Sequence, residues 1–259
     1  MFEITYLQMV LSIISGLIVG FSLGLIGGGG SILAIPLLIY FVGYDHPHIV
    51  IGTTALAVSI NAFLNLIPHA RKKHVIFKKG IIFSIPGIFG VLVGAELGLL
   101  TPGKKLLFIF AILMIIIAIY MLKRKYTNES ENPTLKESYP KLLVIGFIVG
   151  FASGYFGIGG GFLIVPGLIY SAGLNIIQAV GTSLISVGLF GFVTALRYSL
   201  NGDLNLLITS LYIAGGILGG WMGAHFATKV SKRTLTKIFA IIIILVAIYM
   251  MYMNFTAFF

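Results

Sequence analysis

The sequence has no cysteine, one tryptophan and only 7 acidic residues among 259. Without cysteine the chain has no disulfide bond, no thiolate nucleophile and no cysteine ligand for a metal. Only 9% of the residues are charged, whereas 58% are hydrophobic, and the mean hydropathy is +1.08. A water-soluble core does not need so much apolar sequence, so the composition excludes an ordinary soluble domain.

Long uncharged runs such as 106–122 and 238–255 are long enough to cross ~30 Å of hydrocarbon. The longest polar stretch, 123–141, has the length of a linker rather than of a domain. The net charge of +10 comes from basic residues that lie between apolar runs, so we attribute it to membrane orientation and not to nucleic-acid binding. The first residues lack a basic region, and we therefore expect no cleaved signal peptide.

One glycine-broken hydrophobic segment occurs twice. Residues 16–40 and 146–170 are identical at 14 of 25 aligned positions, and Gly52-Thr53 is repeated as Gly181-Thr182. Duplicated hydrophobic segments that are interrupted by glycine or proline are typical of the binding sites of transporters.

The apolar pattern predicts five helical elements in each half. They span roughly 5–26, 31–42, 49–68, 80–100 and 104–122, then 141–156, 161–172, 176–197, 205–227 and 235–255. The second element of each half has 12 residues and rises ~18 Å, too little to cross alone, so each first pair is either re-entrant or two tilted half-spans. We predict an all-α integral membrane protein with two inverted repeats, 1–122 and 141–259, joined by a linker at 123–140. The glycine-broken hairpins are expected to meet near mid-membrane.

The basic residues support inversion of the repeats. With five elements per half, the loops at 70–79, 123–141, 171–175 and 228–237 share one side of the membrane. They carry 14 of the 17 basic residues, namely Arg71, Lys72, Lys73, Lys78, Lys79, Lys123, Arg124, Lys125, Lys136, Lys141, Lys229, Lys232, Arg233 and Lys237. Four parallel spans per half would divide the basic residues 11 to 6. Because cytoplasmic loops are enriched in lysine and arginine, we place the linker in the cytoplasm and both termini outside the plasma membrane.

The glycine runs are the first candidate site. In each copy a helix is expected to begin directly after the run, so that free backbone N–H groups and a partial positive charge face an anion. The candidate substrate-binding residues of the two runs are Gly28, Gly29, Gly30 and Ser31, and Gly159, Gly160 and Gly161. The alternative is that these glycines only let helices pack closely, which is the role we expect for Gly16 and Gly146.

Polar residues inside apolar helices are further candidates. Thr53, Thr54, Thr182 and Ser183 recur in both halves, and their hydroxyl groups suit an oxyanion; alternatively they bond to a carbonyl of their own helix or join helices. Asn61 and Asn65 share one helix face, whereas Phe190 and Thr194 occupy the corresponding places in the second half. We include Asn61 in the candidate site, with helix association as the alternative.

Glu96 and His225 hold equivalent places and are candidates for proton coupling, although both lie near helix ends where they would reach interfacial water. Asp45, His46 and His48 resemble a metal cluster, but Pro47 and the loop setting favour an exposed turn, so no metal site is predicted.

The two glycine motifs resemble those of the sulfite exporter TauE/SafE family, also called the toluene sulfonate uptake permease family. The matching residues are Gly20–Gly24 with 27–30 and Pro36, and Gly150–Gly154 with 157–161 and Pro166, together with the Gly-Thr-Thr/Ser pairs. The resemblance covers nearly the whole chain. It implies secondary transport of sulfur-containing anions such as sulfite, sulfoacetate or aryl sulfonates. Ile158 stands where the first copy has Gly28, so the two half-sites need not bind alike.

The sequence therefore favours a secondary transporter of small sulfur-containing anions, with an anion channel or a non-transporting membrane scaffold as alternatives. We expect no enzyme and no cofactor, because no nucleophile–base pair, phosphate loop or paired carboxylates stand out. The expected partners are the anion, a coupling proton or sodium ion, and the lipid bilayer. The identity of the anion, the direction of transport and the oligomeric state stay open.

The charge distribution makes a prediction about topology. Single cysteines introduced at Ser130 and Ala257 can be exposed to a membrane-impermeant thiol reagent in intact cells. We expect labelling at position 257 and protection at position 130, because the linker is placed in the cytoplasm. The reverse pattern would show that the orientation is wrong.

Overall fold

The computed structural model describes residues 4–26, 31–123, 138–159, 161–226 and 232–255. In these ranges the chain forms helices and no strand. The long helices are α1 (Tyr6–Ile26), α3 (Pro47–Arg71), α4 (Phe77–Leu100), α5 (Gly103–Lys123), α6 (Tyr139–Phe156), α8 (Ile176–Ser199), α9 (Leu206–Phe226) and α10 (Lys232–Asn254). The short ones are α2 (Ala34–Pro36), the π-helix η2 (Leu37–Phe41) and α7 (Gly161–Ala172).

The prediction of an all-α integral membrane protein is confirmed. Eight of the described helices are long and apolar enough to cross a membrane, and the two short apolar helices lie at 31–41 and 161–172, as expected. Local signals set several helix ends. Proline begins α3 at Pro47, where its missing N–H is harmless. The side-chain oxygen of Asn175 accepts the backbone N–H of Gln178 and so caps α8.

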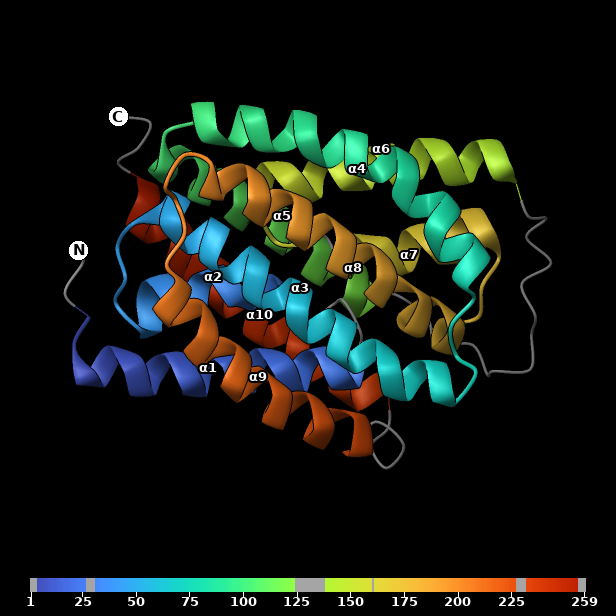
Figure 1. The fold of residues 1–259 in the computed structure, drawn as a ribbon, viewed down its shortest axis with the longest axis horizontal. Helices are drawn as coiled ribbons and strands as arrows, with labels where there is room; N and C mark the ends of the chain where they lie inside the picture. The colour runs from blue at the N-terminus through green and yellow to red at the C-terminus, as the bar shows by residue number, and fades with distance from the viewer. Residues whose placement is uncertain (1–3, 27–30, 124–137, 160, 227–231, 256–259) are drawn as a thin grey trace.

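The long helices lie side by side, and most of their ends gather at two opposite ends of the molecule (Figure 1). One end, which we name the Gly43 end, holds the start of α1 and the loops 42–46, 101–102 and 200–205; Gln8 Nε2 donates to the Gly43 carbonyl there, at 3.3 Å. The other, the His74 end, holds loops 72–76 and 173–175 and the start of α6. There Lys79 Nζ donates to the Ala172 carbonyl at 2.9 Å.

Helices of one half pack mainly against helices of the other. Helix α1 lies along α9, and its counterpart α6 lies along α4. This gives a first bundle of α1, α2, η2, α3 and α9, and a second bundle of α6, α7, α8 and α4, while α5 pairs with α10. Each helix pair of one half has a counterpart in the other, since α1 with α9 corresponds to α6 with α4. Helices α1 and α6 run in opposite directions in Figure 1. This arrangement agrees with an inverted repeat, but inversion relative to a membrane stays a prediction.

Glycine makes these pairings close. A Cβ atom on Gly20 of α1 would overlap the carbonyl group of Gly216 on α9. In the second bundle, a Cβ on Gly150 of α6 would overlap Gly87 of α4 in the same way. Small residues that let backbones approach are the usual basis of helix association in membranes, where apolar burial alone gives no preference for protein over lipid. Gly16 and Gly146 have this packing role, because a Cβ on either would overlap a backbone carbonyl group of the facing helix, at Tyr212 and Phe83 respectively.

Helices α3 and α8 form the centre of the molecule. In their most apolar 18-residue stretches, 67% and 61% of the residues are buried, against 33–44% in the other long helices. They contact each other directly, since the hydroxyl of Ser59 donates to the Gly188 carbonyl at 2.7 Å. The site that connects both halves is therefore expected where α3 meets α8.

Replacing Gly16 or Gly146 with alanine tests the glycine contacts. The added Cβ must push two backbones apart, so we expect the free energy of unfolding to fall by about 1–3 kcal/mol, seen as a lower thermal midpoint in detergent. Ala214→Val on the exposed face of α9 serves as the control and should leave the midpoint unchanged. Equal midpoints for all three variants would contradict the close packing.

Candidate functional site

The break between α6 and α7 is built from glycines in a conformation that other residues rarely adopt. Gly157 ends α6 with φ 68°, and its N–H donates to the Ser153 carbonyl at 2.9 Å. Gly159 follows with φ 63°, and α7 begins at Gly161. Because both φ angles lie in the left-handed region, a side chain at either place would strain the turn. A Cβ on Gly157 would also overlap Ile51 of α3, so the turn lies directly against the central helix.

Gly159 lies where the two central helices meet. A Cβ built on it would be 3.3 Å from Val187 Cγ1 and 3.4 Å from Val58 Cγ1. These valines are separated by 129 residues, the offset of the repeat, and each stands near the middle of its helix. Gly159 therefore lies beside the middle of α3 and of α8, whereas the meeting of the two hairpins near mid-membrane stays a prediction. Sequence reasoning missed both valines, although their equivalence in the repeat was a usable signal.

The first turn of α7 supplies backbone donors at this depth. The first four N–H groups of an α-helix have no partner within the helix, and the N-terminus carries a partial positive charge. Helix α7 has 12 residues and begins beside the Gly159 turn, with Gly161, Phe162 and Ile164 buried. Such an end can bind an anion without any charged side chain.

The first glycine run lies outside the described residues, so the predicted contacts at Gly28, Gly29 and Gly30 are not visible, nor is that at Gly160. Ser31 is fully buried and begins a 3₁₀ turn that leads into α2. The first short helix continues as the π-helix η2, whereas α7 is α-helical throughout. The two halves therefore differ in backbone as well as in sequence.

Two predicted hydroxyl groups accept hydrogen bonds from the loops that lead into α9 and α4, the helices that pack against the other half of the chain. Thr53 Oγ1 accepts the N–H of Asn205 just before α9, at 3.0 Å. Its counterpart Thr182 accepts the N–H of Ile76 just before α4, also at 3.0 Å. These contacts lie at the Gly43 end and the His74 end respectively, so the structure does not bring the two threonines together.

The neighbouring hydroxyl groups bond within their own helices. Thr54 Oγ1 donates to the Val50 carbonyl and Ser183 Oγ to the Val180 carbonyl, each at 2.7 Å. This is the alternative that sequence reasoning left open. A role for these four residues in contacting substrate stays a prediction.

Asn61 differs from the hydroxyl residues. It is fully buried, and neither atom of its side-chain amide has a hydrogen-bond partner among the described residues. The amide lies against Gly216 of α9, one turn along α3 from Val58 and hence from the Gly159 turn. Asn65 Nδ2 donates to the Asn61 carbonyl on the same helix at 2.9 Å, while its Oδ1 is buried without a partner in the described structure. The expected alternative of hydrogen bonds that join helices is thus not observed for this pair.

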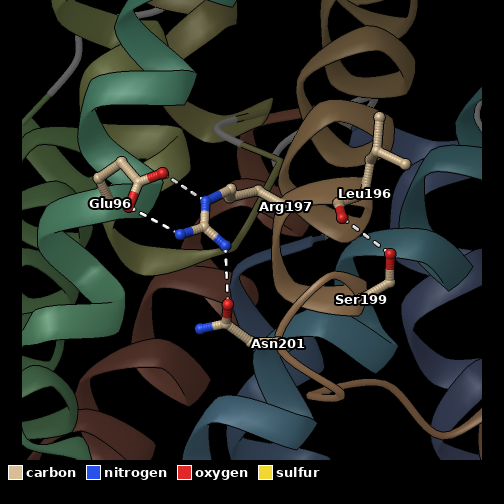
Figure 2. Close-up of polar contacts among 5 residues, drawn as sticks. All are labelled: Glu96, Leu196, Arg197, Ser199 and Asn201. Carbon is tan, nitrogen blue, oxygen red and sulfur yellow. Dashed lines mark hydrogen bonds and ion pairs between the residues drawn. The ribbon is translucent and has the colours of Figure 1, made fainter.

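Glu96 is engaged in an ion pair (Figure 2). The guanidinium of Arg197 on α8 donates through Nε to Oε1 and through Nη2 to Oε2, the latter at 2.8 Å. Nη1 of the same group donates to Asn201 Oδ1 at 2.9 Å. The Glu96 side chain is 53% exposed and lies toward the Gly43 end, far along α4 from the helix middle. His225 is exposed near the end of α9, at the opposite end of the bundle, and packs edge-on against Phe226.

Of the three residues that resembled a metal cluster, Asp45 and His46 lie in the turn before α3, and His48 lies in the first turn of α3. His48 bonds through Nε2 to the Thr101 carbonyl at 3.1 Å, and His46 packs against Tyr44. The hydrogen bond of His48 thus connects the start of α3 to the loop before α5 at the Gly43 end.

Comparison with known proteins gives a consistent set of relatives. Residues 12–250 match the family described as "Sulfite exporter TauE/SafE". The chain is 44% identical to a "Probable membrane transporter protein" of Xylella fastidiosa strain Temecula1, over 96% of this chain and 97% of the relative. It is 30% identical to one from Haemophilus influenzae, over 93% and 97%, and 28% identical to YunE of Bacillus subtilis, over 95% and 98%.

The ion pair of Glu96 leads to a prediction about pH. Because its carboxylate is paired with Arg197 and half-exposed, we expect Glu96→Gln to lower the thermal midpoint slightly and to leave the pH dependence of anion flux into proteoliposomes unchanged. Arg197→Gln should have the same effect, and the double variant should be no less stable than either single one. His225→Gln is the matched variant at the other end. A changed pH profile in Glu96→Gln would assign that residue to proton coupling.

Proposed function

Because the chain belongs to the TauE/SafE sulfite exporter family, we propose that it is a secondary transporter that moves small sulfur-containing anions across the plasma membrane. The observation that supports this most directly is the Gly159 turn, which lies between Val58 and Val187 at the centre of the molecule. Helix α7 begins beside this turn, and the N–H groups of its first turn have no partner within the helix.

The proposed anion site lies between the two glycine runs, Gly28–Ser31 and Gly159–Gly161. Non-helical backbone at membrane depth is tolerated only where protein encloses it or where it lines a wet cavity. Burial of Ser31 and of the Gly159 turn agrees with that requirement. Backbone N–H groups act as neutral donors, so the site needs no lysine or arginine, and an anion bound there can leave again without separating from a buried basic side chain.

The sulfur chemistry of the substrate rests on the description of the family. Sulfite and sulfonates carry three oxygen acceptors around one centre, which suits convergent N–H donors from two helix ends. The relatives are named only as membrane transporters, so the particular anion is part of the proposal.

We also propose that the His74 end faces the cytoplasm. The described basic residues of this end include Arg71, Lys72, Lys73, Lys78, Lys79 and Lys141. The structure gathers the loops that carry them at one end of the bundle, as the five-element topology requires (Figure 1). Such an excess of positive charge favours the cytoplasmic side.

Valine substitutions in the glycine runs test the anion site. A β-branched side chain at Gly29 or Gly160 would stand where substrate and backbone must meet, so we expect binding of sulfite or an aryl sulfonate to weaken at least tenfold, by about 1.4 kcal/mol or more. Binding can be followed by the substrate-induced rise in thermal midpoint, with carboxylates of similar size as competitors.

Gly16→Ala and Gly146→Ala are the controls for this experiment. They disturb packing on the same helices, so they should lower the midpoint without substrate but preserve the order of preference among anions. If Gly29→Val and Gly160→Val fold and bind with unchanged affinity, the glycines serve packing alone. In proteoliposomes, saturable flux indicates a carrier, flux without saturation indicates a channel, and no flux indicates a scaffold.

A further inference from the structure

The interface between α3 and α9 contains polar groups that the anion site does not use. Asn61 and Asn65 are both buried on the face of α3 that meets α9, against Gly216 and Gly220. Three of their four amide atoms, Asn61 Nδ2, Asn61 Oδ1 and Asn65 Oδ1, have no partner among the described residues. Buried polar groups are nearly always hydrogen-bonded, so this set calls for an explanation.

A packing role does not explain the pair. A leucine has nearly the same shape as asparagine and would fill the space beside a glycine without leaving buried donors and acceptors unsatisfied. The second bundle shows this solution, because at the position equivalent to Asn61 it has Phe190, whose ring lies against Gly87. Apolar packing is thus sufficient at this place in the fold, and helix packing does not require the two amide groups.

The free atoms are mainly acceptors. Two neutral carbonyl oxygens on successive turns of one helix, about 5–6 Å apart at their Cβ atoms, are hard ligands of the kind that alkali and alkaline-earth cations prefer. Cation sites in secondary transporters use neutral backbone and side-chain oxygens in the same way, near the bilayer midplane. An anion would instead require donors, and this pair offers one free amide group as a donor against two free oxygens.

The position of the pair suits a coupled ion. Asn61 is three residues along α3 from Val58, hence ~4.5 Å along the helix axis from the residue that contacts the Gly159 turn. A cation there would lie close to the proposed anion, and opposite charges attract strongly where little water screens them. Glu96, the carboxylate that sequence reasoning suggested for coupling, is paired with Arg197 and half-exposed.

We propose that Asn61 and Asn65 bind a monovalent cation, sodium, which accompanies the anion through the membrane. The site occurs once per chain, because Phe190 and Thr194 stand at the equivalent places in the second half. One cation per univalent anion cancels the work of ~2.3 kcal/mol per 100 mV that inward movement of a single negative charge requires. This inference rests on the proposed transport of anions, but cation binding can be measured without any anion substrate.

The test compares sodium with choline at constant ionic strength, using the purified full chain in detergent with no sulfur anion present. We expect saturating sodium chloride to raise the thermal midpoint by about 2–4 °C relative to choline chloride. Asn61→Leu and Asn65→Leu should each abolish this rise. In choline, Asn61→Leu should unfold at the same or a higher temperature than the unchanged chain, because it removes unsatisfied polar atoms.

Thr194→Val is the matched control, since Thr194 is equivalent to Asn65 and its hydroxyl is also buried without a partner in the described structure. It should keep the full response to sodium. The inference is overturned if the unchanged chain shows no rise with sodium, or if the rise persists in both leucine variants. Sodium-independent binding of a sulfonate together with no sodium response would remove the cation site and leave the anion transporter intact.

Discussion

A helix that breaks inside protein leaves backbone N–H and C=O groups without helical partners, and the two central helices of this structure cover one such break. Between α6 and α7 the chain reverses on glycines with positive φ angles. The turn lies against Ile51 and Val58 of α3 and Val187 of α8, so two full-length helices cover it on that side. The most buried helices of the molecule are the two that contact it. A buried glycine turn thus lies where the two central helices meet.

Helix α9 of the second half packs against α1 of the first, and helix α4 of the first half packs against α6 of the second. Each half supplies one glycine-faced helix at its start, α1 or α6, and the complementary face belongs to the other half. A single half would expose a row of glycines with no helix to contact, and such a surface gains little from lipid. The two halves depend on each other for folding even though each carries its own copy of the pattern. The duplicated sequence is thus a repeat of elements and not of independent domains.

The elements could be predicted because their signals are local. The short helices at 31–41 and 161–172 follow from glycine runs and from the length of the apolar stretch, and their bounds agree with the structure. The pairing of the helices could not be predicted, because glycine spacing on α9 indicates a close contact but not that α1 is the partner. Arg197 and Glu96 are 101 residues apart, so no local pattern connects them. Thr53 and Thr182 were recognised as equivalent, but the N–H groups that they accept come from loops whose path depends on how α4 and α9 pack. For Asn61, sequence reasoning found the residue and missed the feature that sets it apart, which is an amide facing bare backbone on α9.

Helices α4 and α9 also determine how far the two bundles can move apart. The chain passes directly from the first bundle to the second through loop 72–76, and from the second to the first through loop 200–205. These two tethers lie at opposite ends of the molecule (Figure 1). Thr182 accepts the N–H of Ile76 at the end of loop 72–76, and Thr53 accepts the N–H of Asn205 at the end of loop 200–205. The two tethers have five and six residues, so they would span at most ~17 Å and ~20 Å if fully extended. If one bundle rocked against the other, the end that opened would draw on its own tether while the other slackened, and the hydrogen bonds of Thr53 and Thr182, which shorten both tethers, would limit the amplitude of that opening.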